Sequence, residues 1–409
     1  MSTESSVYTY RAFDRGGTAQ EGEIEGESKA SVAAQLRLRG LTVVDVNEKK
    51  QAPTVEDLLG RWKKVKARDL TVFSRQLATM VSSGLSLLRA LYILEDQTED
   101  KKLKSTVIAV RQDVEAGLSL SQAMEKHDKV FNKLFVSMVR AGEAGGALED
   151  TLERAAVQME KDDNLKRTIK SAMVYPALIG CFAIVVLVGM ILFLIPIFKN
   201  MYKDLGGKLP PLTQFMIDLS DNMKAYWYVF MVGPIIGVIA FKKWKRSDRG
   251  ERQWDAFKLR IPMQIGDIVQ KVVVARFART LGTLTASGVP ILQALEITAE
   301  TAGNRLVADP MVDVLEKVRQ GSALAPPIAK IPVFPGMMTQ MVAVGEETGA
   351  MDRMLNKLAD FYEDEVAAKV KALTSILEPI MMIFVGAIVG VVVLAMYMPL
   401  FKIFDLVKD

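Results

Sequence analysis

The stretch that decides the fold is FSRQLAT at residues 73–79, followed by SGLSLLRAL at residues 83–91. The chain repeats this pattern as FARTLGT at residues 277–283, followed by SGVPILQAL at residues 287–295. In both copies the apolar residues recur at helical spacing, and a Ser-Gly pair follows where a turn would end the helix. The sequence therefore predicts two tandem helical domains of one kind.

A second motif marks the end of each copy. RAGEAGGAL at residues 140–148 returns as AVGEETGAM at residues 343–351, and a proline follows each motif where a long apolar run begins. We interpret the glycine-rich part of each motif as a turn between helices. The residues shared by the copies, together with an acid before the last apolar run, are our candidates for structural or partner-contact roles: Phe73, Arg75, Gly84, Gly142, Glu143, Gly146, Pro176, Phe277, Arg279, Gly288, Gly345, Glu346, Gly349, Glu378 and Pro379.

Hydrophobic residues make up 50% of the chain, and they concentrate in three runs without any charge. Because a helix needs roughly 20 apolar residues to cross the hydrocarbon layer, each run is long enough to span a membrane, the middle one only just. The charge-free runs are residues 171–198, 225–241 and 379–401, and we expect transmembrane helices at residues 171–198, 225–241 and 376–401.

Basic residues indicate the orientation of these helices. Lys and Arg gather before the first span at residues 161–170 and after the second at residues 242–252, but they are sparse in residues 199–224. Since such residues are enriched on the cytoplasmic side, both flanks are predicted to be cytoplasmic and the loop between them external. Residues 1–6 lack a basic stretch followed by an apolar one, so no cleavable signal peptide is predicted. The amino terminus and both repeats are then cytoplasmic, and the carboxyl terminus is external.

The first part of the chain, residues 7–48, predicts a small β-β-α-β module. A hairpin signal stands at residues 14–17, and the helix is predicted to begin after Ser28 and to end at Gly40. We interpret its acidic second strand as a solvated face, with a docking surface for a basic partner as the alternative. The polar connector that follows is predicted to hold a short helix at residues 55–62.

The predicted fold class is a mainly α, polytopic membrane protein with two cytoplasmic helical bundles, three transmembrane helices and a small N-terminal module. The segments are the N-terminal module 1–50, a linker 51–67, repeat one 68–170, the first span 171–198, an external loop 199–224, the second span 225–241, a basic cytoplasmic linker 242–271, repeat two 272–375, the third span 376–401 and an external tail 402–409.

The sequence shows no sign of an enzyme. It has one histidine, His127, and no GxxxxGK[ST], HExxH, CxxC or GxSxG motif. Its single cysteine, Cys181, can form no intrachain disulfide. A cation site built from Glu143, Glu149 and Asp150 stays open as an alternative, although carboxylates in such a place more often cap helices. We expect no catalytic residue, no cofactor and no metal.

The motifs occur as an ordered set that resembles a known family. The doubled F-x-R-x-L-x-T and G-E-x-x-G patterns combine with YP at residues 175–176, LP at 209–210, LEP at 377–379 and MPLF at 398–401. This set resembles the general secretion pathway protein F and type IV pilus inner-membrane platform family, over residues 68–406. The N-terminal module is similar to the small domain found ahead of it.

The resemblance implies a fold and a function. It implies two six-helix bundles and an oligomer, a dimer or higher, in the bacterial inner membrane. The function that it implies is a platform that couples a cytoplasmic hexameric assembly ATPase to the extraction and polymerisation of pilin or pseudopilin subunits. Other inner-membrane assembly proteins are further implied partners, and nucleic acid is not one. One departure between the copies is Thr280, which stands where the first copy has Gln76, and it suggests that the bundles differ in what they contact.

Two other functions are compatible with a repeated membrane protein. A transporter can be built from internal repeats, but such repeats lie mostly within the bilayer, whereas here most of each copy is predicted to be soluble. A membrane signalling scaffold is the weaker alternative. Within the family, the sequence leaves pilus biogenesis, type II secretion and competence open, with general resemblance favouring the pilus branch.

Overall fold

The structure is a computed structural model that describes residues 6–13, 19–26, 29–38, 42–48, 65–197, 211–262 and 264–406. The chain divides into two compact units, Met1–Lys64 and Val65–Asp409. Several predicted features lie outside the described residues: the hairpin turn at 14–17, the helix limits at Ser28 and Gly40, and the connector helix at 55–62.

The first unit contains a three-stranded antiparallel sheet with strand order β2-β1-β3. Its elements are β1 Ser6–Phe13, β2 Ala19–Gly26, α1 Lys29–Leu38 and β3 Thr42–Glu48. The central strand pairs on both sides, so that Tyr8 lies opposite Ile24 of β2 and Glu48 of β3. Alternating side chains suit such a strand, because successive residues point to opposite faces of a sheet.

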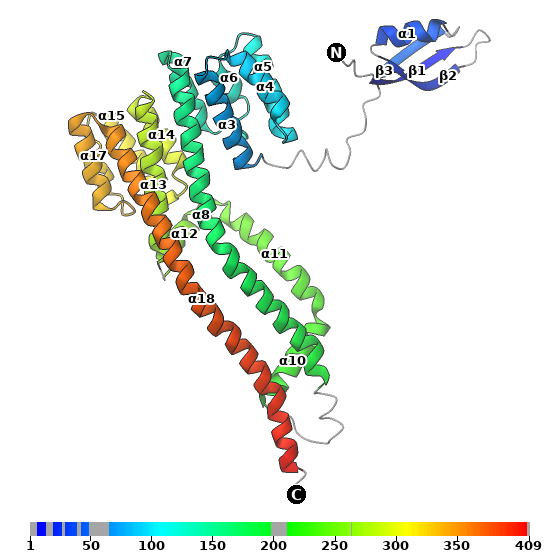
Figure 1. Cartoon of the computed structure of the whole chain (residues 1–409), viewed down its shortest axis with the longest axis vertical. Helices are drawn as coiled ribbons and strands as arrows, with labels where there is room; N and C mark the ends of the chain where they lie inside the picture. Colours follow the sequence, from blue (N-terminus) through cyan, green and yellow to red (C-terminus); the bar gives the residue numbers. More distant parts are fainter. Residues whose placement is uncertain are drawn as a thin grey trace. The chain divides into compact units, whose positions relative to one another are not determined.

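The second unit contains two bundles of six helices each, built in the same order (Figure 1). The first bundle consists of α3 Ala67–Ser82, α4 Leu87–Gln97, α5 Lys101–Glu115, α6 Leu120–Glu125, α7 Lys133–Gly145 and α8 Leu148–Gly189. The second consists of α13 Ile265–Ala286, α14 Ile291–Thr301, α15 Arg305–Arg319, α16 Ala325–Ile328, α17 Gly336–Thr348 and α18 Met351–Leu406. The predicted tandem repeat and the mainly helical fold are confirmed.

Local signals in the sequence explain these helices. The predicted apolar stripe is buried, with Phe73 2% exposed and Leu77 fully covered, and the core is continuous between the two bundles. Equivalent caps start the third helix of each bundle: Asp100 accepts hydrogen bonds from two amides of α5, and Asn304 accepts one from α15. These caps satisfy N–H groups that a helix start leaves unpaired.

Three helices are long and apolar enough to cross a membrane: Leu148–Ile197, Trp227–Lys245 and Met351–Ala395. The first and third begin in the bundles, since α8 and α18 run without a break from bundle core to apolar segment and lie side by side (Figure 1). A short π-helical turn, η1 Met190–Leu194, directly follows α8. The second is α11 Trp227–Lys245, which buries no side chain within the chain. The predicted number of three spans agrees with these three helices, and the predicted bounds of the spans stay predictions.

Two segments predicted without helices contain one each. The loop between the first two spans holds α10 Pro211–Ala225, and the basic linker after the second span holds α12 Asp248–Arg260. Ser247 caps α12 by accepting a hydrogen bond from the amide of Gly250 at 3.2 Å. The distribution of Lys and Arg was used to predict on which side of the membrane each segment lies. It carries no information on secondary structure, so neither helix was predicted.

Candidate functional site

An arginine in the first helix of bundle one is held by the last helix of the same bundle. Arg75 of α3 donates to the carboxylates of Glu153 and Glu160 in α8, with its Nε 2.5 Å from Glu160. The hydrogen bond from Arg75 holds the pKa of Glu160 below its ordinary value. A guanidinium that bridges two carboxylates fixes the orientation of both helices, because its donors have a planar, rigid geometry.

The second bundle repeats this arginine clamp with different partners. Arg279 of α13 donates to Asn356, Asp360 and Glu363 of α18. Burial raises the pKa of Asp360, but the hydrogen bonds and charges of Arg279 and Lys161 together leave that pKa lowered. The Arg279 side chain is 10% exposed, against 31% for Arg75, so this clamp is the better shielded one. The two arginines thus join the first and last helices of their bundles.

The two candidate phenylalanines are core residues. Phe73 is 2% exposed and its ring centre lies 6.0 Å from that of Phe131, while Phe277 is fully covered and lies 4.7 Å from Phe334. Aromatic pairs at these distances contribute packing energy beyond their buried area. Both residues therefore stabilise the bundles and offer no surface to a partner.

Glycine ends the first helix of each bundle for a conformational reason. Gly84 has φ +83° and Gly288 has φ +77°. In both turns the glycine amide and the amide after it bond back to carbonyls of the helix, as in a Schellman motif. A Cβ added at either position would meet no atom within 4 Å. Each glycine therefore lies in the turn that ends the helix, and its positive φ, not a close approach of other atoms, favours glycine there.

The glycine-rich turn begins later than predicted. Gly142 and Gly345 lie inside α7 and α17, and only Gly146 and Gly349, both with φ +66°, have left the helix. A Cβ on Gly142 would lie 1.8 Å from the Thr151 hydroxyl oxygen. The helical glycines are thus packing positions, where α7 and α17 approach the helix that follows, while the later glycines end the helix.

The glutamate of each motif braces a neighbouring helix. Glu143 accepts hydrogen bonds from the amides of Leu120 and Ser121 at the start of α6. Glu346 accepts a hydrogen bond from the amide of Leu324 at 2.8 Å, at the start of α16. A carboxylate at the positive end of a helix satisfies unpaired amides. Within the described residues, no group of three or more His, Cys, Asp or Glu side chains is placed to hold a metal ion.

The prolines and the acid at the membrane boundary lie inside continuous helices. Pro176 lies within α8, and Glu378 and Pro379 lie within α18. Beyond them large apolar side chains are exposed, with Phe182 at 71% and Ile383 at 73%. Such a surface suits contact with lipid. A functional role for Glu378 stays a prediction.

The two bundles contact each other through residues that are not among the predicted contact candidates. The hydroxyl of Thr283 in α13 and the side-chain oxygen of Gln158 in α8 lie 3.0 Å apart, with both residues buried. Lys161 reaches from α8 to Asp360 and Glu363 at 3.3 and 3.5 Å, so the acids that hold Arg279 also hold the first bundle. These contacts are not duplicated, because each joins unlike positions of the two copies.

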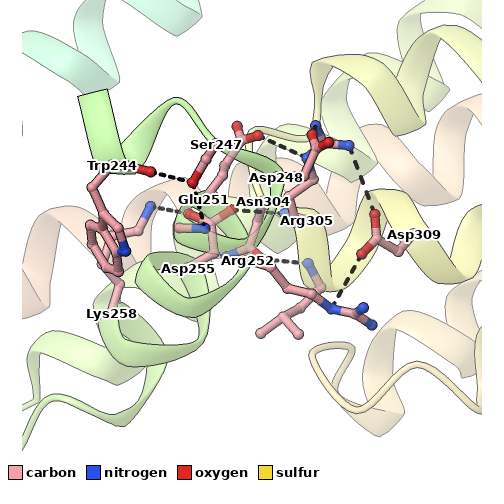
Figure 2. Close-up of polar contacts among 12 residues, drawn as sticks. Trp244, Ser247, Asp248, Glu251, Arg252, Asp255, Lys258, Asn304, Arg305 and Asp309 are labelled. Carbon is pink, nitrogen blue, oxygen red and sulfur yellow. Dashed lines mark hydrogen bonds and ion pairs between the residues drawn. The ribbon is translucent and has the colours of Figure 1, made fainter. Parts of the chain in front are cut away.

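The chain returning from the second span is fastened to the second bundle (Figure 2). Asp255 of α12 accepts a hydrogen bond from the amide of Arg305 at 2.8 Å, at the start of α15. The Arg305 guanidinium contacts Glu251 at 2.9 Å and Asp248 at 3.4 Å. The acidic residues of the predicted basic linker therefore hold it against the second bundle. They alternate with Lys and Arg, so the net charge of the segment does not reveal them.

Comparison with known proteins accounts for the doubled motifs. The family described as type II secretion system (T2SS), protein F matches residues 73–196 and again 277–399, and the N-terminal domain of type II secretion system protein F matches residues 5–47. The chain belongs to the type II secretion system protein F family. The predicted resemblance is confirmed.

Proteins named for type IV pilus assembly and for type II secretion are both similar to this chain along almost its whole length. The type IV pilus assembly protein PilC of Thermus thermophilus is 43% identical over 399 residues, 97% of this chain and 98% of that protein. PilC of Myxococcus xanthus is 41% identical over 403 residues, 98% and 95%. The type II secretion system protein F of Pseudomonas aeruginosa is 35% identical over 404 residues, 98% and 100%.

Substitutions at Gly84 and Gly288 test whether positive φ is what favours glycine at these turns. Gly84→Val and Gly288→Val are each expected to destabilise the chain by about 1–2 kcal/mol or more, because a β-branched residue is strained at positive φ. Gly336→Ala is the control: its added Cβ also meets no atom within 4 Å, but it has no positive φ. Thermal unfolding in nanodiscs measures all three, and equal effects would contradict the argument.

A second substitution tests the contact between the bundles. Thr283→Val removes the hydroxyl partner of Gln158 and is expected to cost about 1–3 kcal/mol, because a buried amide oxygen loses a hydrogen bond. Thr79→Val alters the equivalent residue of the first bundle, whose exposed hydroxyl bonds only within its own helix, and it should change stability by less than about 0.5 kcal/mol. Indistinguishable unfolding midpoints for the two variants would show that the bundles do not depend on this contact.

Proposed function

We propose that this chain is the inner-membrane platform protein of a type IV pilus or type II secretion machine. It couples a cytoplasmic hexameric assembly ATPase to the extraction and polymerisation of pilin or pseudopilin subunits, and it carries out no catalysis itself. Support comes from family membership and from full-length similarity to proteins named for pilus assembly and for type II secretion.

The observation that carries this proposal is the continuity of α8 and α18. Each helix is part of a bundle core at one end and apolar and exposed at the other. A continuous helix joins its two ends by a fixed rise per residue, so a displacement of a bundle along the helix axis moves the attached span. A protein that passes motion from a motor to subunits in the membrane needs such a connection.

The topology and the assembly state belong to the same proposal. We place both repeats, residues 68–170 and 272–375, and the N-terminal module 1–50 in the cytoplasm, with residues 402–409 outside. The basic flanks of the first two spans support this orientation. The working form is an oligomer, and other inner-membrane assembly proteins complete the machine.

Within the family we favour the pilus branch. The pilus assembly proteins of Thermus thermophilus and Myxococcus xanthus are 43% and 41% identical to this chain, against 35% for the type II secretion protein of Pseudomonas aeruginosa. Loss of surface pili in cells without this protein, with secretion intact, supports the pilus branch. Loss of secretion alone would assign the protein to the other machine.

Insertions into α18 test the mechanical connection. Seven glycines placed between Thr374 and Ser375 should abolish pilus assembly while the chain still reaches the membrane, because a glycine-rich segment is flexible. Seven alanines at the same site add about two helical turns and keep the helix, so assembly should persist at least in part. Pili on cells with the glycine insertion would refute transmission through this helix.

The proposed motor and orientation are tested separately from that connection. The full-length protein in detergent should retain the assembly ATPase of the same organism, and reporter fusions at residues 246 and 321 should give cytoplasmic signals. A fusion after Asp409 should give an external signal. An external signal at residue 321 would contradict the topology, and failure to retain the ATPase with the bundles intact would contradict the partner.

A further inference from the structure

The last proline of the third span removes one backbone hydrogen bond from α18. Pro399 lies inside this helix, which runs from Met351 to Leu406. Proline has no N–H, so the carbonyl oxygen four residues earlier, that of Ala395, has no helical donor. An unpaired carbonyl in apolar surroundings costs free energy, because water cannot reach it.

A side chain from a different helix supplies the missing donor. The hydroxyl of Thr213, in the first turn of α10, donates to the Ala395 carbonyl oxygen at 2.7 Å. Both residues are buried, with Thr213 2% and Ala395 1% exposed. The bond therefore joins the one carbonyl that Pro399 leaves without a donor to a hydroxyl shielded from solvent.

Apolar packing encloses this hydrogen bond. Ile191 of the π-helical turn, Ile195, Met216 and Ile217 form one buried cluster with Ala395. The π turn of the first span, the helix between two spans and Ala395 of the third span thus meet at one place. Irregular backbone within a membrane protein is tolerated where neighbouring groups satisfy it, and this cluster provides such a place.

The arrangement at Pro399 differs from that at the other prolines inside the described helices. Beyond the first turn of a helix, they are Pro176, Pro196, Pro234, Pro310 and Pro379. Among the described residues, no side chain from a different helix donates to the carbonyl four residues before any of them.

We propose that Thr213 is a positioning residue that replaces the missing N–H of Pro399 and thereby locks α10 and the end of the first span onto the third span. The lock holds the ends of these spans together at the side of the membrane away from the bundles. It does not depend on which machine the protein serves, and it is tested on the purified full chain.

A double-mutant cycle in nanodiscs tests the lock, read by hydrogen–deuterium exchange of residues 211–225. Thr213→Val keeps the shape but loses the donor, so exchange of α10 amides should rise about two- to tenfold, the factor expected for one hydrogen bond. Pro399→Ala restores an N–H for Ala395. In that background Thr213→Val should change exchange by less than about twofold, because the carbonyl is already satisfied.

Two controls separate this bond from general packing. Thr213→Ser keeps a hydroxyl and should exchange as the unaltered chain does. Ser220→Ala removes another buried hydroxyl of α10 that has no hydrogen-bond partner among the described residues, and it should leave exchange unchanged.

Several results would overturn the lock. An equal rise from Thr213→Val with and without Pro399→Ala would show that the hydroxyl acts on something other than the carbonyl left by proline. No rise at all would show that the bond does not hold α10. If Thr213→Val alone does not fold, recovery by Pro399→Ala supports the lock, and failure to recover overturns it.

Discussion

The structure depends on one constraint: the last helix of each bundle is also a helix that crosses the membrane. The buried face of α8 and α18 closes a bundle core at one end, and their apolar surface is exposed at the other. A single helix cannot shift relative to the lipid without shifting the core that it completes. The arginine clamps lie on the bundle part of these helices, where Arg75 and Arg279 fix the first helix of each bundle against the last.

The two copies agree in what holds each bundle together and differ in what joins them. Helix-ending glycines, capping glutamates and clamp arginines recur at equivalent positions. The contacts between bundles are one-sided, since Lys161 and Gln158 of the first copy meet acids and a threonine of the second. This difference is expected after duplication and divergence. Folding constrains both copies in the same way, whereas each copy contributes a different side of the contact between the bundles.

The sequence alone predicted the features that arise from local patterns. Periodic apolar residues located the bundles, charge-free runs located the spans, and motifs such as F-x-R-x-L located the clamp arginines. Their partners Glu160 and Glu363 were missed, because a carboxylate on an exposed helix surface looks the same whether it pairs or not. The helices α10 and α12 were not predicted, because their segments were interpreted from charge alone. The Thr213–Ala395 hydrogen bond was not predicted either, because it joins residues 182 positions apart.

The docking of α12 gives the second bundle an additional attachment. Asp255 and the acids around Arg305 tie it to the chain that leaves the second span, while α18 ties it to the third. The first bundle continues into a single span through α8. A body attached at two points resists rotation about either one, so a torque applied to the second bundle is shared by two spans.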